Sequence, residues 1–298
     1  MTERILVTGA SGLLGSSIAL RLSRRGFEVL GVKRHSLADF PFPTIKLDLK
    51  NSVETREVIR TFRPTTIVHA AALSKVLECE QDPVNAHDQN VDVTETLLRV
   101  ADEIESHFVF ISTDQVFSGV DGNYTEADTP APTHVYGRAK YAAEQLVSHA
   151  NPEHLIARSN NIVGRNVGWG TSFTDALLDK LHRNQFVELF TDQIRSPIHL
   201  RAITDGLCNC ICLRVPGILH LGGPEHLSRY DTGQKLAEAY SLPLDRIKRA
   251  SLSSHPQAHT LHKDGTFDTT KFLRLFPEQG YYTILDGFRL DRDMPRQP

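Results

Sequence analysis

A short apolar strand, a glycine-rich turn and an apolar helix follow one another at the start of this chain. Residues 5–8 read Ile-Leu-Val-Thr, glycines follow at positions 9, 12 and 15, and an apolar run over 13–22 predicts a helix. Such glycines permit a tight turn, close approach of the backbone to a pyrophosphate and close packing of helix on strand. The start of the helix adds free N–H groups and the positive end of its dipole. Although the spacing differs from the usual G-x-G-x-x-G, the sequence predicts a dinucleotide-binding turn made by Gly9, Ser11, Gly12, Leu13, Leu14 and Gly15.

Strands and helices alternate along the first half of the chain. Further strands are predicted over 27–32, 44–49, 66–69, 108–112 and 155–157. Helices are predicted between them, over 53–62, over 90–101 and around 136–140. This alternation predicts an α/β fold with a doubly wound parallel sheet, the Rossmann arrangement.

Beyond about residue 160 the alternation fades. Helices are predicted over 172–183, 202–213 and 232–240, with short strands near 187–190 and 218–221. We expect a dinucleotide-binding domain over residues 1–160 that also receives 195–222. Residues 161–194 and 223–298 are expected to form a smaller C-terminal substrate lobe over the carboxyl edge of the sheet, where such folds bind ligands.

Two cations end the second predicted strand. In a dinucleotide-binding fold this position faces the adenosine ribose, and an acidic residue there would bond the 2′-hydroxyl of NAD. Lys33 and Arg34 instead suit the 2′-phosphate of NADP. The alternative is an ordinary solvated charge cluster at a strand end. We expect NADP(H) to be preferred, with NAD(H) as the second possibility.

Composition limits the partners and the compartment. The net charge of −3 gives no reason to expect nucleic acid. No apolar run approaches the ~20 residues that span a bilayer, and the N-terminus does not read as a signal peptide. The sequence therefore predicts a cytoplasmic protein without a membrane segment.

Three of the four cysteines form a C-x-C-x-C run within the helix predicted over 202–213. Helical spacing puts Cys208 and Cys212 on one face and turns Cys210 elsewhere. No neighbouring Cys or His pair completes a ligand set. We therefore expect buried small hydrophobic side chains and no metal site.

Tyr136 and Lys140 stand four residues apart on a predicted helix, so their side chains share one face. A tyrosine with a pKa of about 10 is a poor proton shuttle at neutral pH, and a neighbouring ammonium lowers that pKa. Thr113 follows the strand predicted over 108–112 and so lies at the ligand-binding edge. Taken alone, this spacing is explained equally well by an ordinary Tyr–Lys pair on the exposed face of a helix. Together with the glycine turn it predicts a site of proton transfer.

Several motifs resemble those of extended short-chain dehydrogenase/reductases, namely TGASGLLG, Ser112-Thr113-Asp114 and Tyr136-x-x-x-Lys140. Within that family, STDQVFSG, VYGRAK, AALSKVLECEQDP and DQIRSP are similar to the dTDP-4-dehydrorhamnose reductase branch. The resemblance extends from Ile5 to the DTTKFLRLF segment. That branch also includes the regulatory subunit of methionine adenosyltransferase, which keeps the fold and binds NADP.

The resemblance implies roles for individual residues. Thr113 would bond the substrate carbonyl, Tyr136 would protonate it, and Lys140 would tune the tyrosine and hold the nicotinamide ribose. It also implies that the cofactor contacts Tyr136 and Lys140. The further cofactor positions are Asp48 and Leu49 beside the adenine, Asn90 on the preceding helix, and Ala70, Ala71 and Ala72 along the cofactor path.

Departures from the family pattern fall on the substrate side. Gln115 stands where the reductases commonly have a tyrosine, and Asn161 stands where they often have a tryptophan. An amide offers donors and acceptors where a ring offers a flat apolar wall. The two residues are therefore expected to line a substrate pocket that prefers a more polar keto-sugar.

The resemblance implies an NADP-dependent reductase of a keto group on a nucleotide sugar, and hence a small-molecule substrate. Two alternatives stay open. One is an NADP-binding regulatory subunit without turnover. The other is a sugar-nucleotide epimerase or dehydratase, which Gln115 disfavours because an amide cannot ionise. A homodimer is also left open.

Overall fold

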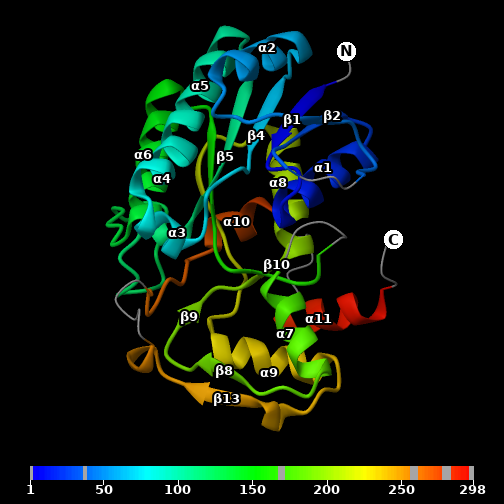
Figure 1. Cartoon of the computed structure of the whole chain (residues 1–298), viewed down its shortest axis with the longest axis vertical. Coiled ribbons are helices and arrows are strands. Elements are labelled where there is room, and N and C mark those ends of the chain that lie inside the picture. The colour runs from blue at the N-terminus through cyan, green and yellow to red at the C-terminus, as the bar shows by residue number, and fades with distance from the viewer. Residues whose placement is uncertain (1–2, 36–38, 167–171, 256–260, 277–282, 295–298) are drawn as a thin grey trace.

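A parallel sheet forms the centre of the molecule (Figure 1). The structure is a computed structural model that describes residues 3–35, 39–166, 172–255, 261–276 and 283–294. Within these residues, seven strands pair in the order β11-β6-β5-β4-β1-β2-β3, all parallel. They are β1 (Arg4–Thr8), β2 (Glu28–Lys33), β3 (Thr44–Lys46), β4 (Thr66–His69), β5 (His107–Thr113), β6 (Leu155–Ser159) and β11 (Gly217–Leu221). The predicted doubly wound sheet is confirmed.

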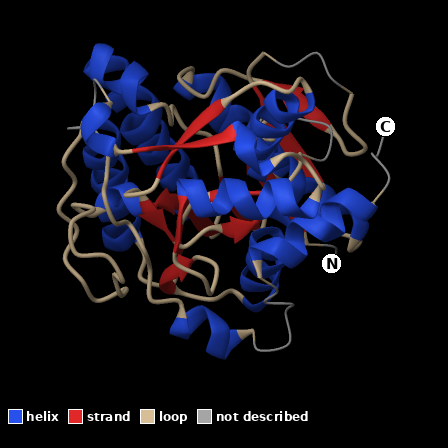
Figure 2. Ribbon diagram, turned by 90° about the horizontal axis from the view of Figure 1, so that it is seen from below, coloured by secondary structure: helices blue, strands red, loops and turns tan. Residues whose placement is uncertain are grey.

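Helices cover both faces of this sheet (Figure 2). On one face, α1 (Leu13–Arg24) and α8 (Leu200–Leu213) bury apolar side chains such as Ile18 and Leu207 against β1, β4 and β5. On the other face lie α2 (Ser52–Phe62), α5 (Val93–Glu103) and α6 (Val135–Ala150), which pack around Phe108 and Phe110. The alternate side chains of each strand thus enter two separate cores.

A smaller group of elements lies beyond the carboxyl edge of the sheet, in the lower part of Figure 1. It comprises α7 (Phe173–His182), β8 (Val187–Phe190), α9 (Arg229–Ala239), β13 (Ile247–Ala250) and α11 (Ile284–Asp293). These elements share their own apolar core around Leu177, Leu236 and Phe288. Short strand pairs join this lobe to the rest: β7 (Ile162–Val163) with β10 (Ile198–His199), and β9 (Ile194–Arg195) with β12 (Leu227–Ser228).

The chain leaves and re-enters the main sheet. Residues 200–221, which the sequence analysis groups with the first domain, supply α8 and β11. One part of the segment grouped with the lobe also returns: α10 (Thr270–Leu275) packs on β11. Its Phe272 ring lies so close to Gly206 of α8 that a Cβ there would stand 2.5 Å from the ring.

Some predicted boundaries are wrong. The strand predicted over 44–49 ends at Lys46. The helix predicted over 90–101 begins as one turn of π-helix, Asp88–Asp92, and continues as α5; a 3.6-residue pattern does not distinguish a π-helical turn. Two short helices, α3 (Val76–Gln81) and α4 (Pro83–His87), were not predicted. Cys208 and Cys210 are buried, as expected, whereas Cys212 is exposed. Cys208 and Cys212 were expected to share a helix face, but they differ in burial.

A buried ion pair fastens α6 to the sheet. The Arg158 guanidinium on β6 donates to the Glu144 carboxylate at 2.7, 3.0 and 3.2 Å, and both side chains are almost fully buried. The Ser112 hydroxyl also donates to Glu144, and the guanidinium lies over the Phe117 ring at 5.0 Å. This ion pair fixes the position of α6 along the sheet. It thereby also fixes Lys140, which lies one turn before Glu144 on the same helix.

We predict that Glu144→Leu lowers the free energy of unfolding by about 3–5 kcal/mol, because Arg158 is left as an unpaired buried charge. Urea unfolding at neutral pH measures the change. The double variant Glu144→Leu/Arg158→Met should recover most of the loss, since neither charge remains. A single variant as stable as the unmutated protein would contradict this account.

Candidate active site

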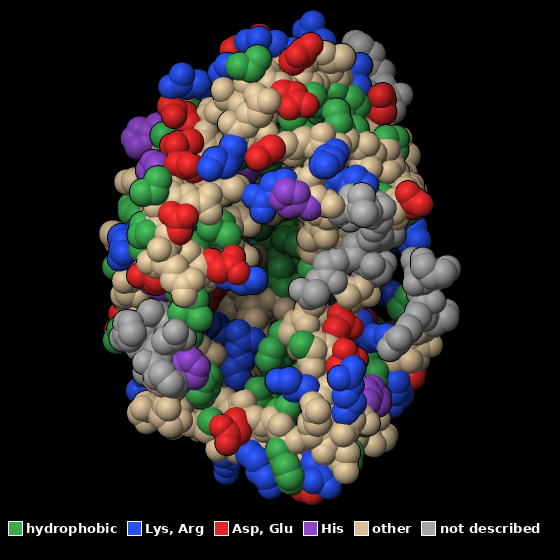
Figure 3. Space-filling view, in the orientation of Figure 1, with side chains coloured by type: hydrophobic (Ala, Val, Ile, Leu, Met, Phe, Trp, Pro, Cys, Tyr) green, Lys and Arg blue, Asp and Glu red, His purple; other side chains and the backbone are tan. Residues whose placement is uncertain are grey.

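A cavity of about 430 Å³ lies along the carboxyl ends of β1, β4, β5 and β6. Figure 3 shows the molecule hollowed between its upper and lower parts, with Lys and Arg side chains along the lower wall. Of the site residues predicted from the sequence, those that line this cavity are Gly9, Ser11, Gly12, Leu13, Leu14, Gly15, Arg34, Asp48, Leu49, Ala70, Ala71, Ala72, Thr113 and Tyr136. Lys33, Asn90, Gln115, Lys140 and Asn161 are not among its lining residues.

The glycine turn closes one end of the cavity. Gly9 has a φ of +66°, and a Cβ there would lie 2.8 Å from the backbone nitrogen of Ala71. A Cβ on Gly15 would lie 2.3 Å from the Gly9 carbonyl oxygen. Helix α1 begins after Gly12 with no side-chain cap and no acidic residue in its first turn. Its first N–H groups therefore face the cavity side unopposed by a carboxylate, which fits the diphosphate of a dinucleotide.

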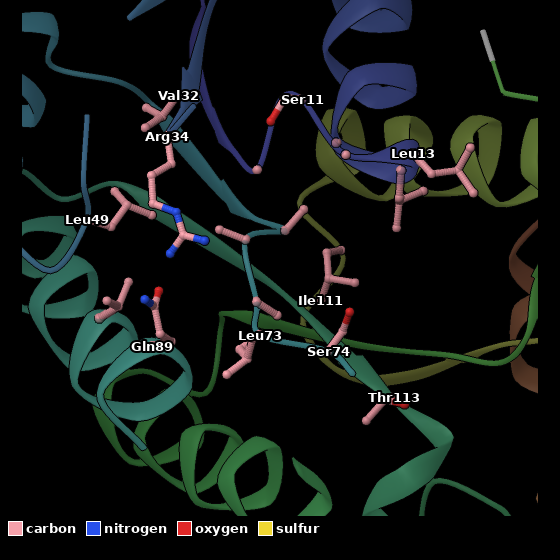
Figure 4. A pocket seen from close by; sticks show the side chains of 18 of the residues that line it. Ser11, Leu13, Val32, Arg34, Leu49, Leu73, Ser74, Gln89, Ile111 and Thr113 are labelled. Carbon is pink, nitrogen blue, oxygen red and sulfur yellow. The ribbon is translucent and has the colours of Figure 1, made fainter. Parts of the chain in front are cut away.

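Only one of the two predicted phosphate-binding cations reaches the cavity. Figure 4 shows the Arg34 side chain extending into it on the side of Leu49 and Gln89, away from Thr113. The Lys33 ammonium instead lies 5.0 Å from the centre of the Phe40 ring. Arg34 is thus placed to contact an adenosine ribose phosphate.

Asn90 does not line the cavity but is hydrogen-bonded to a residue that does. It is buried within the π-helical turn, and its amide exchanges two hydrogen bonds of 3.0 Å with the backbone of Leu73. Leu73 lines the cavity directly after the three alanines. Asn90 therefore holds the loop that follows β4 in place.

Thr113 and Tyr136 open into the other end of the cavity, and Lys140 lies behind them. The Lys140 ammonium is 3.8 Å from the centre of the Phe110 ring. Burial lowers the pKa of Lys140 to about 7, although the Glu144 carboxylate opposes the shift. The pKa of Tyr136 is raised by burial and by the Asp114 carboxylate, against a hydrogen bond with Thr113.

The direction of the Tyr136 shift differs from the sequence-based expectation. Lys140 was expected to lower the pKa of the phenol, but the phenol is nearly buried, and the loss of hydration and the Asp114 carboxylate raise its pKa instead. In this structure Tyr136 therefore keeps its proton at neutral pH. A retained proton suits a residue that protonates a substrate.

Gln115 and Asn161 were expected to face the sugar, and both are hydrogen-bonded to other side chains. The Gln115 amide bonds to Asp114 and His134. The Asn161 amide oxygen accepts from the Arg229 guanidinium at 3.0 Å. The geometry gives no support to these two amides as the wall of a polar sugar pocket.

Several cavity residues were missed by the sequence analysis. They are Val32, Leu47, Leu73, Ser74, Gln89, Val93, Ile111, Ser112, Ser159 and Ile162. Ser159 is the last residue of β6 and Ser112 the last but one of β5, so the rule that ligands bind at the carboxyl ends of strands could have found them. Gln89 lies in the π-helical turn, which no local sequence pattern predicts.

The described part of the chain holds neither a metal-binding cluster nor a membrane-spanning helix. No group of three His, Cys, Asp or Glu side chains there could hold a metal ion. No helix among those residues combines the length and apolar character that crossing a bilayer demands.

The fold is that of an extended short-chain dehydrogenase/reductase. More narrowly, the chain belongs to the RmlD substrate binding domain family, whose model matches residues 3–280. The family resemblance inferred from the motifs is therefore confirmed.

Individual relatives are more distant. The chain is 31% identical over 235 residues to the probable low-salt glycan biosynthesis reductase Agl14 of Haloferax volcanii, which covers 78% of each chain. It is 27% identical over 255 residues to methionine adenosyltransferase 2 subunit beta of Rattus norvegicus, covering 83% of this chain and 75% of that one. Its fold matches that of dTDP-4-dehydrorhamnose reductase from Bacillus anthracis, solved in complex with NADP. The TM-score is 0.86 at 23% identity, covering 98% of this chain and 99% of that one.

We predict that Lys140→Met stabilises the protein at neutral pH. Because the pKa of Lys140 is about 7 when folded and 10.5 otherwise, the unfolded state binds the additional proton between these values. Stability therefore rises with pH across this window, and the cost of burying Lys140 is greatest below pH ~7. The cost is at most about 5 kcal/mol.

Urea unfolding near the two ends of this window tests the prediction. The advantage of Lys140→Met should shrink as the pH rises through it, whereas the exposed control Lys75→Met should show no such slope. A Lys140→Met protein that is less stable at neutral pH, or a difference that does not vary with pH, would overturn it.

Proposed function

We propose that this protein is an NADPH-dependent reductase of a keto group on a nucleotide-linked sugar. One observation carries the proposal: Thr113 and Tyr136 open into the same cavity as the glycine turn and Arg34. A dinucleotide whose phosphates rest on the turn would therefore extend toward the phenol. The reductase Agl14 and the NADP complex of the Bacillus anthracis enzyme support the same assignment.

NADPH, when bound, supplies the hydride, and the chain's own residues manage the proton. The Tyr136 hydroxyl, kept protonated by burial, gives its proton to the carbonyl oxygen. The Thr113 hydroxyl donates to Asp114 at 3.2 Å, which is long for an O–H···O bond, so it can turn to the carbonyl at small cost. Lys140 follows Tyr136 by one turn on α6, and as a cation it would favour the phenolate that the transfer leaves.

One arginine supports a nucleotide-linked substrate. Arg229 donates to Asn161 and Gln193, and burial together with the Arg195 charge lowers its pKa to about 10. A guanidinium group suits the phosphates of a nucleotide sugar. We accordingly assign cofactor binding to residues 1–160 with 195–222, and substrate binding to 161–194 and 223–298.

The direct assay incubates the purified protein with NADPH and a panel of nucleotide-linked keto-sugars, and follows cofactor oxidation and sugar reduction. Stoichiometric oxidation with one of the sugars is the expected result. Cofactor binding without turnover of any sugar would favour a regulatory subunit like the methionine adenosyltransferase relative. Conversion of a sugar without net NADPH oxidation would favour an epimerase or dehydratase.

We predict that Arg34→Ala weakens NADPH binding by about ten- to hundredfold, because it removes a charge-assisted contact to the 2′-phosphate. NADH, which lacks that phosphate, should bind almost unchanged. Lys33→Ala is the matched control, since its ammonium lies on Phe40, and should change NADPH affinity by less than about threefold. Equal affinities of the unmutated protein for both cofactors would contradict the proposal, as would a larger effect from Lys33.

We predict that Tyr136→Phe retains NADPH affinity and loses about 10²–10⁴-fold in turnover, because only the proton donor is removed. Cofactor titration and steady-state kinetics with the accepted sugar measure the two effects separately. Near-normal turnover in this variant would assign proton donation to another group.

A further inference from the structure

We propose that Gln115 and His134 are positioning residues, which form a hydrogen-bonded chain that holds Asp114, Thr113 and Tyr136 in their catalytic arrangement. This inference rests on the proposed reductase function. It replaces the role of sugar contact expected for Gln115 with a role inside the protein.

The donor and the acceptor in each of these hydrogen bonds follow from the first one. The backbone N–H of Gly137 donates to His134 Nδ1 at 3.1 Å, so the imidazole proton is on Nε2. His134 Nε2 then donates to Gln115 Oε1 at 3.0 Å. The other half of the Gln115 amide, Nε2, donates to Asp114 Oδ2 at 2.8 Å. Both ends of the Gln115 side chain are thus determined by their partners.

Asp114 is held on both of its carboxylate oxygens. Oδ2 also faces the Arg195 guanidinium at 3.1 Å, and Oδ1 accepts from the Thr113 hydroxyl. Asp114, Thr113 and Arg195 are all buried. Gly265 lies so close that a Cβ there would stand 2.8 Å from Oδ2. These contacts hold Asp114 in place, and because Thr113 is its neighbour in the backbone, a shift of Asp114 would move Thr113 as well.

His134 links this chain to the helix that carries Tyr136. It is the N-cap residue of α6, and its ring stacks on the Tyr136 ring at a centroid distance of 6.2 Å and an interplanar angle of 7°. The backbone of Gln115 also touches that first turn, because a Cβ on Gly137 would lie 2.2 Å from the Gln115 carbonyl oxygen. The turn after β5 and the start of α6 are therefore joined by a backbone contact as well as by the hydrogen bonds between these side chains.

The charge state of His134 agrees with this polarity. Its pKa is lowered to about 4 by burial and by His262, with a smaller contribution from Arg138 in the same direction, while Glu80 and Asp114 oppose the shift. The imidazole is therefore neutral at neutral pH, with Nδ1 free of a proton. A protonated Nδ1 could not accept the Gly137 bond.

Two variants break the chain at different bonds. Gln115→Leu removes both amide bonds and leaves the His134 cap, whereas His134→Asn keeps a capping side chain that is too short to reach Gln115. Each should lower turnover by about ten- to hundredfold, because small misplacements of catalytic groups are costly. NADPH affinity should stay within about twofold, since neither residue lines the cavity. The double variant should be no worse than the poorer single variant by more than about threefold, because both break one unit.

Thr283→Ala is the control, because it removes an N-cap from α11 and should leave turnover unchanged. Unchanged turnover in either single variant, or losses that multiply in the double variant, would overturn the proposal.

A second readout does not depend on a substrate. In ¹⁵N-histidine NMR spectra, the His134 signal, identified by its loss in His134→Asn, should show a neutral ring protonated on Nε2 at pH 7. Gln115→Leu should shift that signal. A ring protonated on Nδ1, or no response to Gln115→Leu, would refute the chain even if the protein reduces no sugar. If no sugar is reduced but this signature is present, only the proposed function fails.

Discussion

The parallel pairing of β1 with both β2 and β4 is the constraint on which the site depends. Every strand of the main sheet ends at the same edge, so the segments after β1, β2, β4 and β5 meet there although they lie far apart in the sequence. The strand order reverses at β1, and the connections on its two sides run to opposite faces. This divergence opens the cavity. The close passage of the Gly9 backbone past Ala71 keeps its floor narrow.

Burial decides the chemistry at the other end of the cavity. The same loss of hydration that keeps Tyr136 protonated brings the pKa of Lys140 to about 7. Other buried charges near these groups are paired: Glu144 with Arg158, and Asp114 with Arg195. Glu144 is part of α6, and Asp114 begins the turn after β5. The side chains that support the site are therefore more polar than the two apolar cores beside it.

The sequence predicted what local pattern determines. The alternation of strands and helices, the glycine turn and the Tyr136–Lys140 spacing are properties of short segments, and they led to the sheet and to most residues of the cavity wall. What it could not predict depends on contacts that a local pattern does not contain. The Lys33 ammonium lies over the Phe40 ring, and His134 donates to the amide oxygen of Gln115. The direction of the Tyr136 pKa shift likewise follows from how completely the folded chain covers the ring.

The central claim is that one cavity brings a nicotinamide cofactor and the Tyr136 phenol to the same carbonyl group. The most direct test uses NADPH deuterated at the transferable position of the nicotinamide ring, on each face in turn, with an accepted nucleotide-linked keto-sugar. Mass spectrometry of the product measures the transfer. The account predicts deuterium on the reduced carbon of the sugar from one face of the cofactor only. A product without deuterium from either labelled cofactor, formed while NADPH is demonstrably bound, would contradict it.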